Sequence, residues 1–192
     1  MKKTTLYLVG TFHSSKKSKD VLKNIFTRHI FDAILTEGID DKSCSFRKEP
    51  IIVCIILTWF WFLNRLGSEF TLINTIANRH NIPVINMDKS LNEIIDYFHK
   101  PYNNTIYLVF LLLFFKGSQN LIDLILLFIL VIVIYLCYFL LRVQKFRDEF
   151  FHEKIKETKN GGLYNNILII CGKDHIEPIK RKFDVIDLNN EF

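Results

Sequence analysis

The sequence predicts an α/β fold: a mostly parallel sheet flanked by helices, with an inserted hydrophobic helical hairpin. Across most of the 192 residues, short apolar runs alternate with amphipathic segments. Such alternation is typical of strands joined by crossover helices. Residues 102–142 differ, because apolar residues dominate there and predict membrane helices. We therefore expect one α/β domain from residues 1–99 and 143–192, interrupted by a transmembrane hairpin at 102–142.

A strand–helix–strand unit is predicted within the first 38 residues. Residues 5–10 are an apolar run that predicts a buried strand. The stretch "SKDVLKNIFTRHIF" predicts an amphipathic helix, and "DAILTEG" predicts a second short strand. A unit of this length predicts parallel pairing of its two strands. One face of the helix is expected to carry Val21, Leu22, Ile25, Phe26 and Ile30.

The remaining elements of the domain follow the same alternation. The stretch "SEFTLINTIANRHN" predicts a helix with Ser68 as its N-cap, and "IPVINMD" predicts a third strand. "SLNEIIDYF" predicts a short helix capped by Ser90. After the hairpin, a charged helix is expected to stop at Asn160-Gly161-Gly162. "NILIICG" and "FDVIDL" predict the fourth and fifth strands.

The hairpin is predicted from two apolar segments joined by a turn. Residues 124–141 are eighteen apolar residues in succession, which is enough for a membrane helix. "TIYLVFLLLFF" precedes them, and "KGSQN" separates the two. The alternative is a pair of apolar helices buried in the core of a homodimer. Residues 51–63 are too few for a comfortable span, so a buried or interfacial helix is favoured there over a membrane segment.

The basic residues favour a membrane orientation over nucleic-acid binding. The net charge is +5, but the basic residues flank apolar segments, at Lys100, Arg142, Lys145 and Arg147. Positive flanks are typical of the cytoplasmic side of a membrane protein, so we expect the α/β domain there, with the lipid bilayer as a partner and no nucleic acid. The first apolar run is too short for a signal peptide. No Cys-x-x-Cys spacing joins the four cysteines, which are expected to be free thiols: Cys44, Cys54, Cys137 and Cys171.

Two of the predicted strands end in the same Gly-x-x-His step. Gly10 precedes His13 by three residues, and Gly172 precedes His175 in the same way. Chance predicts roughly 0.2 such steps in a chain of this composition, so two at strand ends are notable. The second and third strands end in Glu37 and Asp88. Ligands of open α/β sheets bind at the carboxyl ends of the strands, so we expect these side chains to converge.

Two imidazoles and a carboxylate are a plausible ligand set for a divalent metal. We predict that His13, Glu37 and His175 hold such an ion, leaving one position open for water. The alternative is that both histidines satisfy loop hydrogen bonds, that Glu37 interacts with a helix N-terminus and that Asp88 is a helix cap. The other histidines are expected to be solvated: His29, His80, His99 and His152.

In this order the motifs resemble the TraB/PrgY (pheromone shutdown) family, which is related to GumN-like proteins and the Tiki metalloproteases. The similar segments are "YLVGTFHSSKKSKDVLKNIF", "FDAILTEGID", "LGSEFTLINTIANRHNIPVINMDKSLNEII", "RDEFFHEKI" and "NILIICGKDHIEPI". The resemblance implies a sheet like that of the erythromycin esterase EreA and the haem-binding ChaN. It also implies a metal-dependent peptidase, or a protein that inhibits or degrades a peptide signal, with His13, Glu37, Glu69, Arg147 and His175 as site residues.

The favoured hypothesis is a multi-pass, membrane-anchored, metal-dependent hydrolase of peptides. Mn, Co or Zn would be the ion at the three predicted ligands. Glu69 would be the general base, and Arg147 would bind a substrate carboxylate or orient a site carboxylate. The rival is a non-catalytic membrane protein that binds a peptide or partner in the same crevice and regulates it. A third reading is haem or metal binding without hydrolysis.

Overall fold

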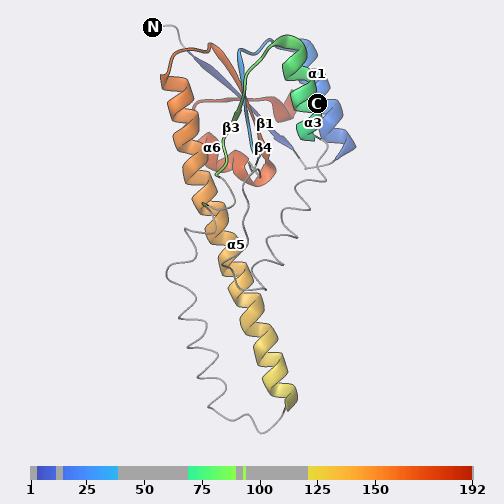
Figure 1. The fold of residues 1–192 in the computed structure, drawn as a ribbon, viewed down its shortest axis with the longest axis vertical. Coiled ribbons are helices and arrows are strands. Elements are labelled where there is room, and N and C mark those ends of the chain that lie inside the picture. The colour runs from blue at the N-terminus through green and yellow to red at the C-terminus, as the bar shows by residue number, and fades with distance from the viewer. Residues whose placement is uncertain (1–3, 12–14, 39–68, 90–92, 94–120, 192) are drawn as a thin grey trace.

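A computed structural model describes residues 4–11, 15–38, 69–89, 93 and 121–191 of the chain. Between residues 121 and 140 it describes the backbone, together with the side chains of Leu130 and Val133. The described residues form a three-layer α/β fold with a central sheet between two layers of helices (Figure 1). The predicted α/β class and its parallel sheet are therefore confirmed.

The sheet has five strands in the order β3-β2-β4-β1-β5, and every neighbouring pair is parallel. Strand β1 (Thr5–Thr11) pairs with β4 (Asn166–Gly172) along its whole length. On the other side of β4 lies β2 (Ala33–Thr36), followed by β3 (Val84–Asn86). The edge strand β5 (Ile186–Asp187) is shorter than the predicted fifth strand. Because all strands are parallel, their carboxyl ends share one edge of the sheet.

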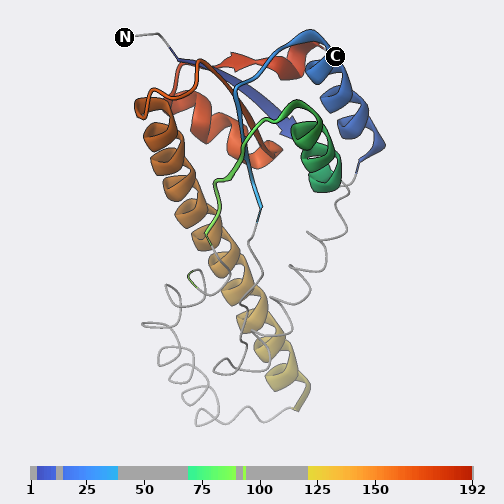
Figure 2. The ribbon, with the colours of Figure 1, turned by 45° about the horizontal axis from the view of Figure 1, so that its top comes forward.

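Helices cover both faces of this sheet (Figure 2). One face carries α1 (Lys16–Arg28) and α3 (Glu69–His80), and the other carries α5 (Leu121–Asn160) and α6 (Ile176–Lys182). Two 3₁₀ segments complete the fold. The segment η1 (Lys173–His175) joins β4 to α6, and η2 (Leu188–Glu191) follows β5.

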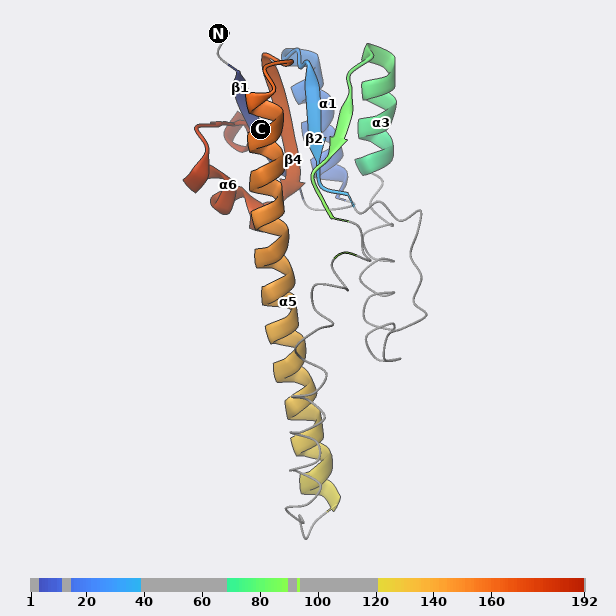
Figure 3. The same cartoon turned by 60° about the vertical axis from the view of Figure 1, so that its left-hand side comes forward.

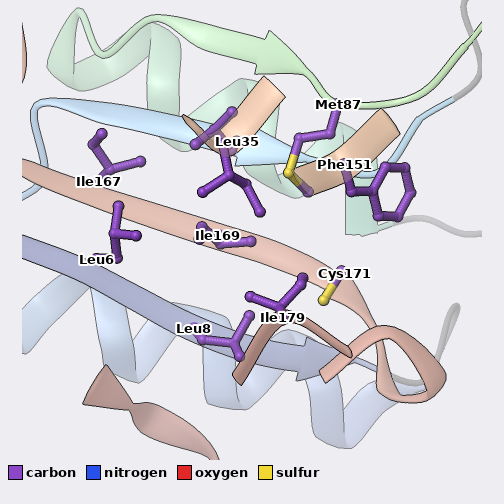
Figure 4. Close-up of a cluster of buried hydrophobic side chains, with 10 residues drawn as sticks. Leu6, Leu8, Leu35, Met87, Phe151, Ile167, Ile169, Cys171 and Ile179 are labelled. Atoms are coloured by element: carbon purple, nitrogen blue, oxygen red, sulfur yellow. The ribbon is translucent and has the colours of Figure 1, made fainter. Parts of the chain in front are cut away.

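The two faces of the sheet form separate cores because side chains alternate along each strand. On β1, Leu6 and Leu8 face α5 and α6, whereas Val9 faces α1 and α3. The same alternation places Ile167 and Ile169 of β4 on the α5 side (Figure 4). Each core is closed by fully buried helix residues: Phe151, Ile155 and Ile179 on one side and Leu22, Ile25 and Ala77 on the other.

The amphipathic face of α1 is shorter than the sequence pattern predicts. Ser15 is the N-cap, and its hydroxyl accepts a hydrogen bond from the Ser18 N–H. Leu22 and Ile25 are fully buried, as expected. Ile30 is 86% exposed, so its assignment to the buried face is wrong. The helix ends at Arg28, and Ile30 lies in the loop before β2, where the helical period no longer sets its direction.

Helix α5 is 40 residues long, which corresponds to about 60 Å at the α-helical rise. Its carboxyl half packs on the sheet, and its amino half extends past the carboxyl edge of the strands (Figures 1 and 3). It ends at Asn160, as predicted; the Gly161 N–H bonds to the Glu157 carbonyl, and Gly162 has a φ of 65°. A glycine in this left-handed conformation is typical of helix ends.

The predicted second arm of the hairpin, residues 124–141, lies within α5. Within the part of the chain that the structure describes, no helix is both long enough and apolar enough to cross a bilayer. Several predictions fall outside the described residues. These are the first hairpin arm, the short helix after Ser90, the Ser68 cap, the segment at 51–63 and the cysteines Cys44 and Cys54. Cys171 is a buried free thiol, as expected.

Candidate functional site

A cluster of buried charged side chains lies at the carboxyl edge of the sheet. Glu37 follows β2, Asp88 follows β3 and His175 follows β4, and these three strands are neighbours in the sheet. Arg147 and Asp148 reach the same place from α5. The structure therefore brings together side chains from four segments, as the carboxyl ends of parallel strands allow.

Arg147 is the centre of this cluster. Its Nε lies 3.1 Å from both carboxylate oxygens of Asp88, and its Nη2 lies 2.5 Å from Asp88 Oδ2. The same Nη2 lies 2.5 Å from Glu37 Oε1. All three side chains are at least nine-tenths buried. Because a planar guanidinium can bind two carboxylates at once, Arg147 ties α5 to the ends of β2 and β3.

Glu37 is also fixed from the other side. Its Oε2 accepts a hydrogen bond of 2.7 Å from the backbone N–H of Gly172, at the end of β4. Its own N–H donates to the carbonyl of Ile170. The carboxylate is thus held in one orientation between Arg147 and the first residue of the second Gly-x-x-His step.

His175 is oriented by Asp148. Its Nδ1 lies 2.5 Å from Asp148 Oδ1, and its ring packs edge-on against Phe151 with 4.9 Å between centroids. A hydrogen bond from Nδ1–H to the carboxylate leaves the lone pair on Nε2. Nε2 lies 3.7 Å from Glu37 Oε1. The second histidine of the sequence motif therefore directs its basic nitrogen at the predicted carboxylate partner.

Burial and mutual charge set the electrostatics of the cluster. Burial opposes the charge of Arg147, but Asp88 and Glu37 outweigh this effect and raise its pKa above its usual value. Burial raises the pKa of Asp88, and Glu37 adds to the rise against the opposing effect of Arg147. Two carboxylates, those of Glu37 and Asp88, contact the guanidinium, and a third, that of Asp148, contacts His175. The cluster has an excess of negative charge, which favours a proton or a cation beside it.

The first Gly-x-x-His step packs against the second. A Cβ on Gly10 would lie 2.1 Å from Cδ1 of Ile176, the residue after His175. The Gly10 N–H donates to Oδ1 of Asn189, which continues the edge of the sheet beyond β5. Glycine is needed here because the end of β1 lies directly against the start of α6.

The predicted site residues are placed as follows. Glu37, Arg147 and His175 lie together, and the contacts of Arg147 are those of a residue that orients carboxylates. Glu69 is 4% exposed at the first position of α3. His13 lies outside the described residues.

Sequence reasoning missed Asp148 and Phe151. The available signal was spacing: Arg147, Asp148 and Phe151 lie within about one turn of a predicted helix, so one helix face can deliver all three. The expectation that His152 is solvated is wrong. It is 9% exposed because α6 packs over its side chain on α5. The helical pattern alone does not predict this packing.

Glu37 and His175 are a fitting pair of donors for a divalent ion. Ligand atoms of a tetrahedral ion lie about 3.4 Å apart, given bond lengths near 2.1 Å, and the observed separation is 3.7 Å. The Asp148–His175 bond is the usual outer contact of a metal-binding histidine. Within the described residues, no three His, Cys, Asp or Glu side chains have an arrangement that could hold a metal ion, so a third ligand would come from elsewhere.

The fold and this cluster define an α/β protein with an ionic site at the carboxyl edge of its sheet. Comparisons with protein-family models, curated proteins and solved structures give no match.

Proposed function

We propose that the chain is a membrane-anchored, TraB-like, metal-dependent hydrolase that acts on a peptide. Its fold would be of the EreA/ChaN type, and its predicted hairpin would hold the α/β domain at the cytoplasmic face of the bilayer. The motif order of the sequence supports the family, and the charged cluster supports the chemistry.

The observation that carries the proposal is the arrangement of His175 between two carboxylates. Asp148 fixes the Nδ1 side of the ring, and Nε2 points to Glu37. A histidine oriented in this way is prepared to bind a metal through Nε2. The excess negative charge of the cluster favours the same cation. His13, from the other Gly-x-x-His step, is the proposed third ligand.

Each residue of the charged cluster has a defined part in this proposal. His175 and Glu37 would bind the ion, and Asp148 would keep the His175 ring in the tautomer with a free Nε2. Arg147 would hold the Glu37 and Asp88 carboxyl groups in place through its two ion pairs. Glu69 is assigned as general base by the resemblance. A divalent ion bound there would supply Lewis acidity and lower the pKa of a bound water.

The membrane anchor is supported by helix α5. Leu130, Val133 and Leu141 are 54%, 48% and 68% exposed, and at 100° per residue they share one side of the helix. Exposed apolar residues that recur on one side of a helix suit an apolar environment such as lipid. The same helix carries Arg147 and Asp148, so the anchor and the site belong to one rigid element.

The test is the metal content of the purified full chain after supply of Mn, Co or Zn. We expect about one ion per chain in the wild type and in the control variant His80→Ala, whose histidine lies on α3. His175→Ala and Glu37→Gln should each lose the ion. Asp148→Asn should retain it with about 10–100-fold weaker affinity. A wild type that binds none of these metals contradicts the proposal.

One observation favours the rival function, a non-catalytic peptide-binding regulator. Both oxygens of Glu37 already accept hydrogen bonds from within the chain. Such a network can serve to hold the carboxyl edge of the sheet rigid. Hydrolysis of a fluorogenic peptide library separates the two functions. Turnover that needs metal and disappears in His175→Ala supports the hydrolase, whereas metal-independent peptide binding without turnover supports the regulator.

A further inference from the structure

A second buried histidine lies outside the charged cluster, between α5 and α6. His152 projects from α5, and its Nε2 lies 3.1 Å from the carbonyl oxygen of Pro178 on α6. Its ring contacts Phe183, with 5.9 Å between centroids, where α6 ends. The side chain therefore touches α6 near both of its ends, and the residue is only 9% exposed.

The contacts of His152 fit its neutral form. A bond to a carbonyl oxygen requires the proton on Nε2. The other nitrogen, Nδ1, is buried and has no hydrogen-bond partner among the described residues. Protonation would add an N–H at this position with no acceptor and would also bury a positive charge.

The charged groups around the ring are Lys182 on α6 and Asp148 and Glu149 on α5. Burial lowers the pKa of His152, and Lys182 lowers it further. The bond to Pro178 and the two carboxylates act in the opposite direction without cancelling the effect. The face of α6 that packs on the ring thus adds a cation where a charged imidazole would need an anion.

We propose that His152 is an acid-sensitive latch that holds α6 against α5. Helix α6 begins directly after His175, and its first residue, Ile176, packs against Gly10. Release of α6 would therefore withdraw His175 from Glu37. The latch extends the proposed function by making the site dependent on pH, but the contact itself requires neither metal nor substrate.

The sign of the pH dependence follows from the lowered pKa of His152. Near its usual value of about 6.5 the unfolded or released imidazole takes up a proton while the packed one stays neutral. The α5–α6 contact is therefore fully stable above that pH and loses stability as the pH falls below it. One extra proton in the released state changes its equilibrium constant by up to about tenfold per pH unit.

The experiment is hydrogen exchange of the full chain at pH 7.5 and 5.5, read by mass spectrometry and corrected for the intrinsic pH dependence. We expect protection of peptides from residues 176–186 to fall by up to about tenfold at pH 5.5, with α1 unchanged. His152→Gln keeps a donor for the Pro178 carbonyl but does not titrate, so it should remove the dependence. The matched control His80→Gln should retain it.

Two results would overturn the latch. One is protection of α6 in the wild type that does not change between the two pH values. The other is a pH dependence that persists in His152→Gln. If that variant does not fold, an NMR titration of the wild-type imidazoles decides: a pKa of His152 at or above about 6.5 contradicts the latch. Loss of metal binding leaves each of these measurements unchanged, so the latch and the hydrolase fail separately.

Discussion

The two faces of the sheet are built from different interactions. The face under α1 and α3 is held by apolar contacts, with Leu22, Ile25 and Ala77 packed on the strands. The face under α5 and α6 has an apolar core as well, but at the carboxyl edge it gives way to buried ions around Arg147 and to His175.

This difference shows which part of the fold lowers the free energy of unfolding. Buried ion pairs seldom stabilise a fold more than apolar residues of the same size, because each charge must leave water. Among the described residues, the buried ion pairs gather at the carboxyl edge of the sheet, and such a costly arrangement at one place is typical of a functional site. The apolar face stabilises the sheet, and the charged edge is the candidate for function.

Replacing Arg147 should have the largest effect. Arg147→Met leaves the buried carboxylates of Asp88 and Glu37 without their cation, which should lower the free energy of unfolding by about 3–5 kcal/mol. Denaturant unfolding of the full chain measures this. Arg147→Lys keeps the charge without the bidentate fork and should lose less. A loss under about 1 kcal/mol for Arg147→Met would show that the two faces do not differ as described.

A cavity on the apolar face should cost somewhat less and leave the site intact. Leu22→Ala removes a fully buried side chain of α1 and should lower the free energy of unfolding by about 3 kcal/mol. We expect its metal content to equal that of the wild type under folding conditions. The comparison with Arg147→Met is direct, because the two variants destabilise similarly but only one disturbs the charged edge. Loss of metal in Leu22→Ala would argue against the separation of the two faces.

The packing of Gly10 against Ile176 should be sensitive to an added methyl group. Gly10→Ala places a Cβ within 2.1 Å of Ile176 Cδ1, so overpacking should cost about 1–3 kcal/mol. Thermal unfolding provides the measurement. The double variant Gly10→Ala, Ile176→Val removes the closest atom and should recover part of the loss. If the double variant is no better than the sum of the single variants, the clash is not the cause.

The smallest effect is expected at the start of α1. Ser15→Ala removes the N-cap bond to Ser18 and should cost about 1 kcal/mol. Ser15→Asn retains a capping oxygen and should stay near the wild type. Both are measured by the midpoint of denaturant unfolding. Equal midpoints for Ser15→Ala and the wild type would show that this cap contributes little to the apolar face.

The sequence by itself determined the local elements of the molecule. A continuous apolar run defined β4 from Asn166 to Gly172, and the Asn160-Gly161-Gly162 stop ended α5 where the structure ends it. It also indicated that Glu37, Asp88 and His175 would gather at one edge. Periodicity and helix capping depend on neighbouring residues along the chain. In any parallel sheet the carboxyl ends of the strands lie at one edge, so these inferences did not require the packing to be known.

Only the tertiary structure decided which groups meet. The order β3-β2-β4-β1-β5, the pairing of Arg147 with Glu37 110 positions away and the contact of Asp148 with His175 are not encoded in any local pattern. The burial of His152 belongs here too, because the helical period cannot say that α6 covers it. The periodicity of the sequence predicts which side of its own helix or strand a side chain lies on. Which residues that side chain contacts depends on how distant elements pack together.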